Sequence, residues 1–374
     1  MVKRQVYVHE NVLDAARRRI SNVFDEYDEI FVSISGGKDS TVLAHLVASE
    51  AQKRGRRIKL FFLDEEVDYE ATIDQVKYLL FDMMPETIVP VWYQFPFKLT
   101  NATSMTEGQL VAWEPGKHKI WMRSKDKRSI HNRPWPDDDI SIGNKLKGFG
   151  FYDVIRNVAS HREKTCFFVG LRAVESPNRW HTVSKNPGFK DWCWTTKGVN
   201  GNINAYPIYD WNFGDIWRYI YENNIRYNKI YDWMWKKGTH MNEIRVSSLI
   251  HEKSFKALVD LPEFEPKTYN KLTKRIKGIQ TANLYGKESR MMKCRTLPKN
   301  FEKWRDYREF LLDTYPDQQI ADIFRKRFSK HLENEYVARQ QCRQVILNDY
   351  ENNLPVRNTE DPREETIKKW MAIL

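Results

Sequence analysis

The segment Ser35-Gly36-Gly37-Lys38-Asp39-Ser40 has the residue types of a phosphate-binding loop. Paired glycines allow positive φ angles and close backbone approach, so consecutive amide groups can point at one anion. Lys38 adds a point charge, and the hydroxyls of Ser35 and Ser40 can donate to phosphate oxygens. We interpret Asp39 as a helix cap or as an acid that faces magnesium. The spacing is neither GxxxxGK followed by Ser or Thr nor GxGxxG, so it is not that of a Walker loop or a dinucleotide-binding loop.

Such a loop needs a strand before it and a helix after it, and the sequence supplies both. Residues 28–34 (DEIFVSI) predict a short buried strand, and residues 40–51 have the apolar spacing of a helix whose positive end would face the anion. The alternation continues through three further predicted elements, at residues 58–63 (strand), 69–84 (helix) and 87–93 (strand). Pro90 in the last of these indicates an edge strand or an irregularity. This order is typical of a parallel sheet covered by helices.

The rest of the chain divides into a long insertion, one more strand and a helical remainder. The insertion spans about residues 100–150, and residues 166–169 (CFFV) predict the further strand. Beyond Trp211 the patterns are largely helical. The segments that carry them are residues 215–224 and then helices from about 252 to the end, including 317–348. We therefore expect a doubly wound, mostly parallel α/β sheet with a helical, basic C-terminal region, and a boundary within 225–265 that divides the chain into domains 1–250 and 251–374.

Three motifs in one order carry a family resemblance. SGGKDS after a strand resembles the pyrophosphate-binding loop of the PP-loop ATP pyrophosphatases, which cleave ATP between the α and β phosphates. Residues 170–176 (GLRAVES) and 206–220 (YPIYDWNFGDIWRYI) resemble two motifs of the phosphoadenosine phosphosulfate (PAPS) reductase-like branch of that superfamily. The C-terminal third and the insertion are similar to phage and prophage proteins of the IbrA type. The resemblance implies an adenine nucleotide alpha-hydrolase-like fold.

The resemblance also implies roles for individual residues. Backbone groups of Ser33 to Ser35 and of Gly170 would contact the adenosine, and Asp64 would lie near the adenine or ribose. Arg172, fixed by Glu175 or placed against the nucleotide, would stabilise negative charge during transfer. The expected catalytic residues are Lys38, Asp39 and Arg172. The expected nucleotide-binding residues are Ser33, Ser35, Gly36, Gly37, Lys38, Asp39, Ser40, Asp64, Gly170, Arg172 and Glu175.

The cysteines depart from the pattern of true PAPS reductases. Those enzymes attack sulfur with a cysteine in a C-terminal E-C-G-x-H segment, which this chain lacks. Cys294 and Cys342 both look helical and have no adjacent histidine. Lys293 and Arg295 beside Cys294 could lower a thiol pKa, but we favour a structural or incidental cysteine. Members that carry an iron–sulfur cluster place cysteines where this chain reads NEIRVSS (242–248), so we expect no cluster.

Net charge and amino-acid composition indicate which kinds of partner the protein binds and where it is located. The 61 Lys and Arg residues exceed the 50 Asp and Glu residues, for a formal charge of +11, which favours anionic partners. Residues 266–310 hold 13 of these cations against 4 acids, and a second basic run covers 117–133, with Trp121 nearby as a stacking face. Each run either binds nucleic acid or is a solvated surface. No apolar stretch is long enough for a membrane span, and the four cysteines are scattered, so we expect a cytoplasmic protein.

These observations favour magnesium-assisted cleavage of ATP to AMP and pyrophosphate, with adenylyl transfer to an unidentified acceptor. Two alternatives stay open. One is a PAPS-binding sulfonucleotide reductase or sulfotransferase, for which Cys294 is the plausible thiol. The other is a nucleotide-sensing transcriptional co-regulator of the IbrA type that binds DNA through 266–310, by way of Lys274, Arg275 and Lys277. For this last class the resemblance implies a ParB-like companion protein.

Overall fold

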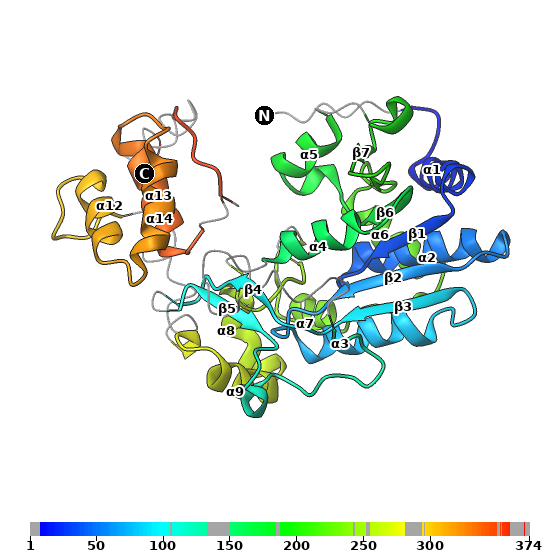
Figure 1. Cartoon of the computed structure of the whole chain (residues 1–374), viewed down its shortest axis with the longest axis horizontal. Helices are drawn as coiled ribbons and strands as arrows, with labels where there is room; N and C mark the ends of the chain where they lie inside the picture. Colours follow the sequence, from blue (N-terminus) through cyan, green and yellow to red (C-terminus); the bar gives the residue numbers. More distant parts are fainter. Residues whose placement is uncertain are drawn as a thin grey trace.

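The computed structural model describes residues 8–104, 107–132, 150–184, 188–241, 244–251, 255–280, 294, 296–349, 352, 354–359 and 370. Figure 1 shows the arrangement. The helices are α1 (Val12–Glu26), α2 (Lys38–Lys53), α3 (Glu70–Lys77), α4 (Phe151–Ser160), α5 (Pro177–Ser184), α6 (Phe213–Glu222), α7 (Ile230–Lys236), α8 (Phe255–Phe264), α9 (Pro266–Arg275), α12 (Trp304–Asp313), α13 (Gln318–Phe328) and α14 (Glu335–Ile346). The strands are β1 (Glu29–Ser33), β2 (Ile58–Leu63), β3 (Ile88–Tyr93), β4 (Phe97–Thr100), β5 (Gln109–Ala112), β6 (Thr165–Val169), β7 (Thr195–Lys197) and β8 (Ile203–Ala205).

Six strands form one sheet in the order β3-β2-β1-β6-β8-β7, and β4 pairs with β5 in a separate two-stranded sheet. All neighbours in the large sheet are parallel except β7 and β8. The doubly wound, mostly parallel α/β fold expected from the alternation of elements is therefore confirmed. The strand containing Pro90 is β3, at one edge of the sheet, where a residue without an amide proton costs no ladder hydrogen bond.

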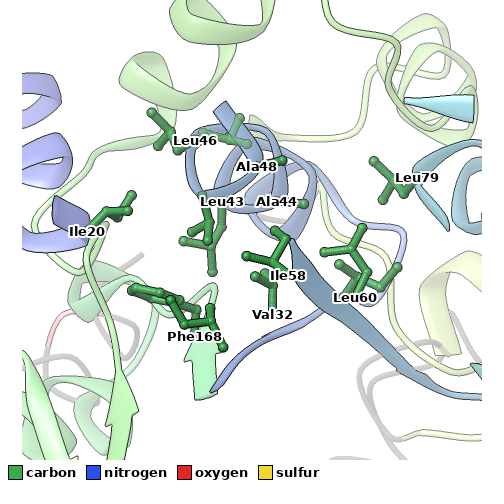
Figure 2. Close-up of a cluster of buried hydrophobic side chains, with 14 of the residues drawn as sticks. Ile20, Val32, Leu43, Ala44, Leu46, Ala48, Ile58, Leu60, Leu79 and Phe168 are labelled. Atoms are coloured by element: carbon green, nitrogen blue, oxygen red, sulfur yellow. The ribbon is translucent and has the colours of Figure 1, made fainter. Parts of the chain in front are cut away.

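Alternate side chains of the central strands belong to two separate apolar clusters, one on each face of the sheet. On the face that α2 covers, Val32, Leu60 and Phe168 pack with Leu43 and Leu46 (Figure 2). On the opposite face, the rings of Phe31 and Phe167 are stacked with centroids 5.2 Å apart. A strand presents successive side chains to opposite faces, so strands covered on both faces read as continuous apolar runs.

Several predicted elements have different bounds in the structure. The helix expected over 69–84 is α-helical only to Lys77 and continues as a π-helix over Tyr78–Asp82. The helical pattern of 317–348 is two helices, α13 and α14, because Asn334 caps a new helix with its side chain on the amide of Val337. About a third of the insertion, at 133–149, lies outside the described residues.

The C-terminal helices pack in two places. Leu258 and Leu261 of α8 and Leu272 of α9 belong to the second cluster, on the sheet. The helices α12, α13 and α14 form a third apolar cluster of their own. The domain division at 250 stays a prediction. No helix in the described part of the chain combines the length and the apolar character needed to cross a membrane.

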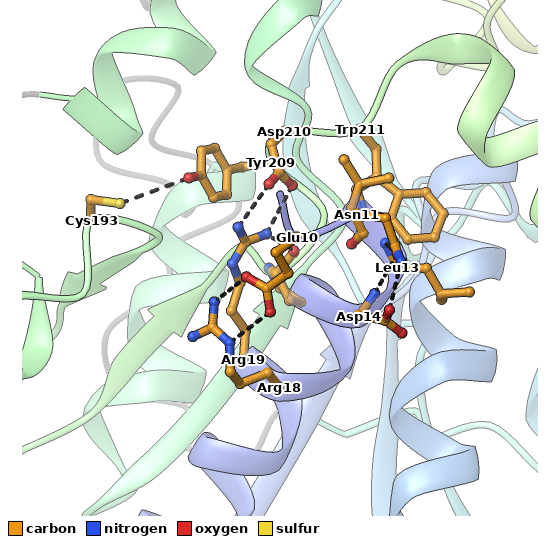
Figure 3. Close-up of polar contacts among 12 residues, drawn as sticks. Glu10, Asn11, Leu13, Asp14, Arg18, Arg19, Cys193, Tyr209, Asp210 and Trp211 are labelled. Carbon is orange, nitrogen blue, oxygen red and sulfur yellow. Dashed lines mark hydrogen bonds and ion pairs between the residues drawn. The ribbon is translucent and has the colours of Figure 1, made fainter. Parts of the chain in front are cut away.

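The first half of the motif at residues 206–220 (YPIYDW) attaches α1 to the sheet. The guanidinium of Arg19 donates to both carboxylate oxygens of Asp210 at 2.8 and 2.7 Å and to the carbonyl of Pro207 at 2.7 Å (Figure 3). Trp211 donates its indole N–H to the carbonyl of Val12 at 3.0 Å. These residues have a structural role in positioning an outer helix.

Candidate nucleotide site

The glycine turn lies where the sheet topology favours ligand binding. β1 ends at Ser33, and α2 begins at Lys38. The chain adds β2 and then β3 on one side of β1, and it later crosses to add β6 on the other side, so the strand order reverses at β1. Open α/β sheets bind ligands at such a switch point, outside the carboxyl ends of the strands.

Gly36 is required by both conformation and space. Its φ is +68°, and a Cβ atom there would stand 2.9 Å from Cγ2 and 3.0 Å from the carbonyl oxygen of Thr72. Any side chain would therefore be strained and would also collide with α3. The turn is thus pressed against the helix that follows β2.

Hydrogen bonds fix the shape of the turn. The Ser40 hydroxyl accepts from the amide of Ser35 and donates to the carbonyl of Gly37, both at 3.1 Å. Asn228 donates to the carbonyl of Gly36 at 3.1 Å, and the amide of Lys38 donates to the Tyr231 hydroxyl at 3.0 Å. Ser40 thus shapes the loop, although it was expected to donate to phosphate.

The helix that follows receives no cap from the side chain of its own N-cap residue, and the Tyr231 hydroxyl occupies only the amide of Lys38. Its N-cap residue is Gly37, and not Asp39 as one interpretation expected. The first amides of a helix have no partner inside the helix, and they lie at the positive end of its dipole. α2 therefore offers an anion-binding end toward the turn.

Charged side chains from two motifs meet at this end of α2. The Asp39 carboxylate accepts from Lys38 Nζ at 2.9 Å and from Arg172 Nε at 2.5 Å. Arg172 also donates to Glu175 at 2.7 Å, and Glu175 is ion-paired with Arg179. The cations of this network outnumber its carboxylates three to two, and so they leave positive charge for a ligand.

Lys38 is the most enclosed of these cations. It is 3% exposed, and its ammonium lies 5.6 Å from the ring centroids of both Phe213 and Tyr231. Burial lowers the pKa of Lys38, while the Asp39 carboxylate acts in the opposite direction. An ammonium held in so little water interacts strongly with a phosphate that enters the site.

The second half of the motif at residues 206–220 positions Lys38. Phe213 and Trp217 lie on α6, and the Trp217 ring packs edge-on against Tyr231 at 5.5 Å. Phe213, Asn228 and Tyr231 were not among the predicted site residues, because their contacts with the loop join positions about 175–195 residues apart.

Gly170 acts through packing. A Cβ atom at this position would lie 3.2 Å from the amide nitrogen of Ser40, so β6 ends in backbone contact with the first turn of α2. The segment that follows can then bring Arg172 to Asp39. Ser33, at the end of β1, is partly buried. Contacts of Gly170 and Ser33 with an adenosine stay predictions.

Asp64 lies at the end of β2, as expected, but protein groups surround it. Its side chain is fully buried and accepts from Trp92 Nε1 at 2.9 Å and from Gln94 Nε2 at 2.8 Å. It also forms a salt bridge with Arg123. In this arrangement the carboxylate organises the end of the strand, and its contact with adenine or ribose stays a prediction.

Asp68, which the sequence did not single out, supplies a carboxyl group with an unusual pKa. Burial and the neighbouring Asp64 carboxylate raise the pKa of Asp68 from 3.8 to about 7, although Arg123 acts in the opposite direction. Between these two values the folded state holds a proton that the unfolded state has lost. Folding stability should therefore fall as the pH rises from about 4 to 7.

The Asp68→Asn variant should lose this part of the pH dependence. Urea unfolding at pH 5 and pH 8 should show the variant gaining stability relative to the wild type at the higher pH. Asp322→Asn, at an exposed position on α13, is the matched control and should follow the wild type. Parallel pH profiles for Asp68→Asn and the wild type would contradict this account.

Glu66 and Arg275 form a buried ion pair that joins the end of β2 to α9. Arg275 Nε donates to Glu66 at 2.6 Å, and both side chains are almost completely buried. The same carboxylate accepts from the amide of Trp113 at 2.6 Å. Arg275 is therefore not available to DNA, which corrects the expectation that it binds the backbone together with Lys274 and Lys277.

The thiols do not fit the sulfonucleotide reductase alternative, for which Cys294 was the plausible reactive thiol. Cys294 is not helical, since its φ is +44°, and burial raises its pKa to about 11, although Arg343 and Arg339 act in the opposite direction. Burial also raises the pKa of Cys342. Burial therefore favours the interpretation of Cys294 as a structural cysteine, because desolvation of the thiolate dominates. Lys293 and Arg295, which flank it, lie outside the described residues.

Comparison with known proteins matches two segments of the chain to family models. Residues 128–237 match the phosphoadenosine phosphosulfate reductase domain family, and residues 238–368 match a domain of unknown function, DUF3440. The first match includes the GLRAVES motif and the motif at residues 206–220, and it begins after the glycine turn. It supports a place in the PAPS reductase-like branch of the PP-loop superfamily, whereas the IbrA-type assignment stays a prediction.

The chain is also similar to individual proteins and solved structures. The chain is 27% identical over 335 residues to the uncharacterized protein YbdN of Escherichia coli (strain K12), covering 86% of this chain and 79% of that protein. It is 21% identical over 220 residues to the adenosine 5'-phosphosulfate reductase of Staphylococcus saprophyticus, covering 58% of this chain and 72% of the reductase. The crystal structure of PAPS reductase from Candida auris aligns with a TM-score of 0.34 at 13% identity, covering 61% of this chain and 93% of that one.

Proposed function

We propose that the glycine turn binds the phosphates of an adenine nucleotide and that the protein cleaves ATP between the α and β phosphates. The AMP moiety would pass to an acceptor, and pyrophosphate would leave. The observation that carries this proposal is the convergence of the amino end of α2, the Gly36 turn and the buried cations Lys38 and Arg172, which both contact Asp39. Each of these groups favours negative charge, and none requires a thiol.

The residues present give each step a physical basis. The amides of the turn and of α2 would hold the departing pyrophosphate. Lys38 and Arg172 would neutralise charge that develops on it, and Glu175 would keep Arg172 oriented. The described residues contain no group of three or more His, Cys, Asp or Glu side chains placed to hold a metal ion. Mg²⁺ would therefore enter as the complex with ATP, held by the phosphates.

The experiment is incubation with ATP labelled on the α or the γ phosphate. Labelled AMP, or an AMP-bearing product, together with pyrophosphate supports the proposal, whereas ADP and orthophosphate contradict it. Addition of candidate acceptors, a ParB-like protein among them, would identify the productive reaction by a rise in pyrophosphate release.

A sulfonucleotide is the second candidate ligand, because residues 128–237 match the PAPS reductase domain family. Competition between ATP and PAPS for the site separates the two ligands. A preference for PAPS together with sulfite release would favour the reductase alternative over ATP cleavage.

The Cys294→Ser variant should keep full activity with either nucleotide. Cys294 is 3% exposed, and its raised pKa leaves almost no thiolate at neutral pH. The measurement is the initial rate of pyrophosphate or sulfite release, with Cys193→Ser as the control at an exposed cysteine. A loss of turnover in Cys294→Ser while folding is unchanged would instead establish a thiol-dependent reaction.

A further inference from the structure

A strongly basic pocket lies beside the edge strand β3, apart from the glycine turn. Its volume is about 490 Å³, and its walls come from α3, the end of β3 and residues 123–128. Thr72 and Val76 of α3 face the glycine turn, whereas Ile73 and Lys77 of the same helix line the pocket. The two sites therefore lie on different faces of one helix.

The residues that line the pocket carry an excess of positive charge. Its lining holds one acid, Asp126, and five cations, which are Lys77, Arg123, Lys125, Lys127 and Arg128. Asp126 accepts from Arg128 at 3.0 Å and lies 3.5 Å from Lys77. The hydrogen bonds and charge of Arg128 lower the pKa of Asp126 to about 2, so its single negative charge persists at neutral pH.

Contacts of the charged groups hold three of these cations, Arg123, Lys125 and Arg128, in place. The guanidinium of Arg128 lies 3.8 Å from the Phe81 ring centroid, and the ammonium of Lys125 lies 5.4 Å from that of Trp121. Arg123 is bound to Asp64 and to the carbonyl of Glu66, yet its Nε–H is buried without an acceptor in the described part of the chain. Fixed cations in excess create a lasting positive potential at the pocket.

The form of the pocket indicates what it binds. Lys127, Arg128 and Ser124 are exposed at its rim, so an extended anion can pass across it. Trp121, expected as a stacking face, packs edge-on against Trp113 with centroids 5.4 Å apart and is partly buried. The pocket therefore offers charge for phosphates without an exposed ring for bases.

We propose that this pocket binds consecutive phosphates of a nucleic-acid backbone. The contacts are electrostatic, and so binding is independent of sequence and weakens steeply with salt. Of the two basic runs that the sequence offered for nucleic acid, 117–133 and 266–310, this chooses residues 123–128 of the first, together with α3.

The test compares two triple variants of the full chain in binding a fluorescent duplex oligonucleotide. Lys77→Gln, Lys125→Gln and Lys127→Gln together neutralise the pocket. Lys53→Gln, Lys197→Gln and Lys326→Gln together remove the same charge from other surfaces, at exposed lysines. Circular dichroism and thermal unfolding verify that both variants are folded.

The pocket variant should bind at least about tenfold more weakly at 0.1 M salt, and the slope of log K against log salt should become shallower by about 2–3. The control should bind like the wild type. Equal losses in both variants would overturn the proposal, because net charge alone would then explain binding. Saturable binding of tripolyphosphate without binding of the oligonucleotide would also overturn it, because the ligand would then be a free polyphosphate.

Discussion

Replacing Lys38 with methionine is expected to slow pyrophosphate release from ATP by about 100-fold or more. Methionine keeps most of the stem that packs between Phe213 and Tyr231 but removes the buried ammonium. Loss of one preorganised charge-stabilising group typically costs about 10²–10³ in turnover. The measurement is single-turnover release of pyrophosphate at saturating ATP, so that weaker binding does not conceal the effect on chemistry.

The same helix provides the control. Lys53 ends α2 with a side chain that is 68% exposed, and Lys53→Met should therefore leave turnover unchanged. Wild-type rates in Lys38→Met would show that this lysine does not act on the reacting phosphates. Burial disfavours the charged form of Lys38, so its replacement by methionine should leave the protein folded. Urea unfolding of the variant verifies this.

Replacing Arg275 with methionine should destabilise the protein by about 3–5 kcal/mol, since it leaves the Glu66 carboxylate buried without its cation. Glu66 is 0% exposed, and its remaining partners are the amides of Trp113 and Met122. The change should appear as a lower urea midpoint, provided that unfolding of this part of the chain is cooperative.

Two further variants separate charge from packing. Lys274→Met, at the exposed neighbouring position, should change stability by no more than about 0.5 kcal/mol. The double variant Glu66→Gln, Arg275→Met should be more stable than Arg275→Met alone, because no buried charge is then left unpaired. Equal stabilities of the single and double variants would show that the loss comes from packing of the Arg275 side chain.

The sequence predicted the sheet and the position of the loop because both signals are local. Apolar runs such as 58–63 and the paired glycines after β1 act within a few residues, and the structure has the corresponding strand and turn. The contact of Arg172 with Glu175 was expected only through the resemblance, and the ion pair between them forms. The nucleotide contacts of these residues stay predictions.

The sequence could not predict contacts made between distant segments. Nothing near Asn228 or Tyr231 indicates that they hold the glycine turn, and nothing near Arg275 indicates a buried partner about 200 residues earlier. Burial also decided one chemical question that the sequence left open, because desolvation of Cys294 outweighs the effect of nearby Arg343 and Arg339 on its pKa. A pattern of charges therefore predicts reactivity only when exposure is known.

The most direct measurement of the central claim is a crystal structure of the protein with an ATP analogue that cannot be cleaved between the α and β phosphates. We predict that the β and γ phosphates lie at the turn of residues 35–40, with amide groups of α2 and the side chains of Lys38 and Arg172 within hydrogen-bonding distance. A nucleotide bound elsewhere, with the turn free of phosphate at saturating analogue, would contradict the account.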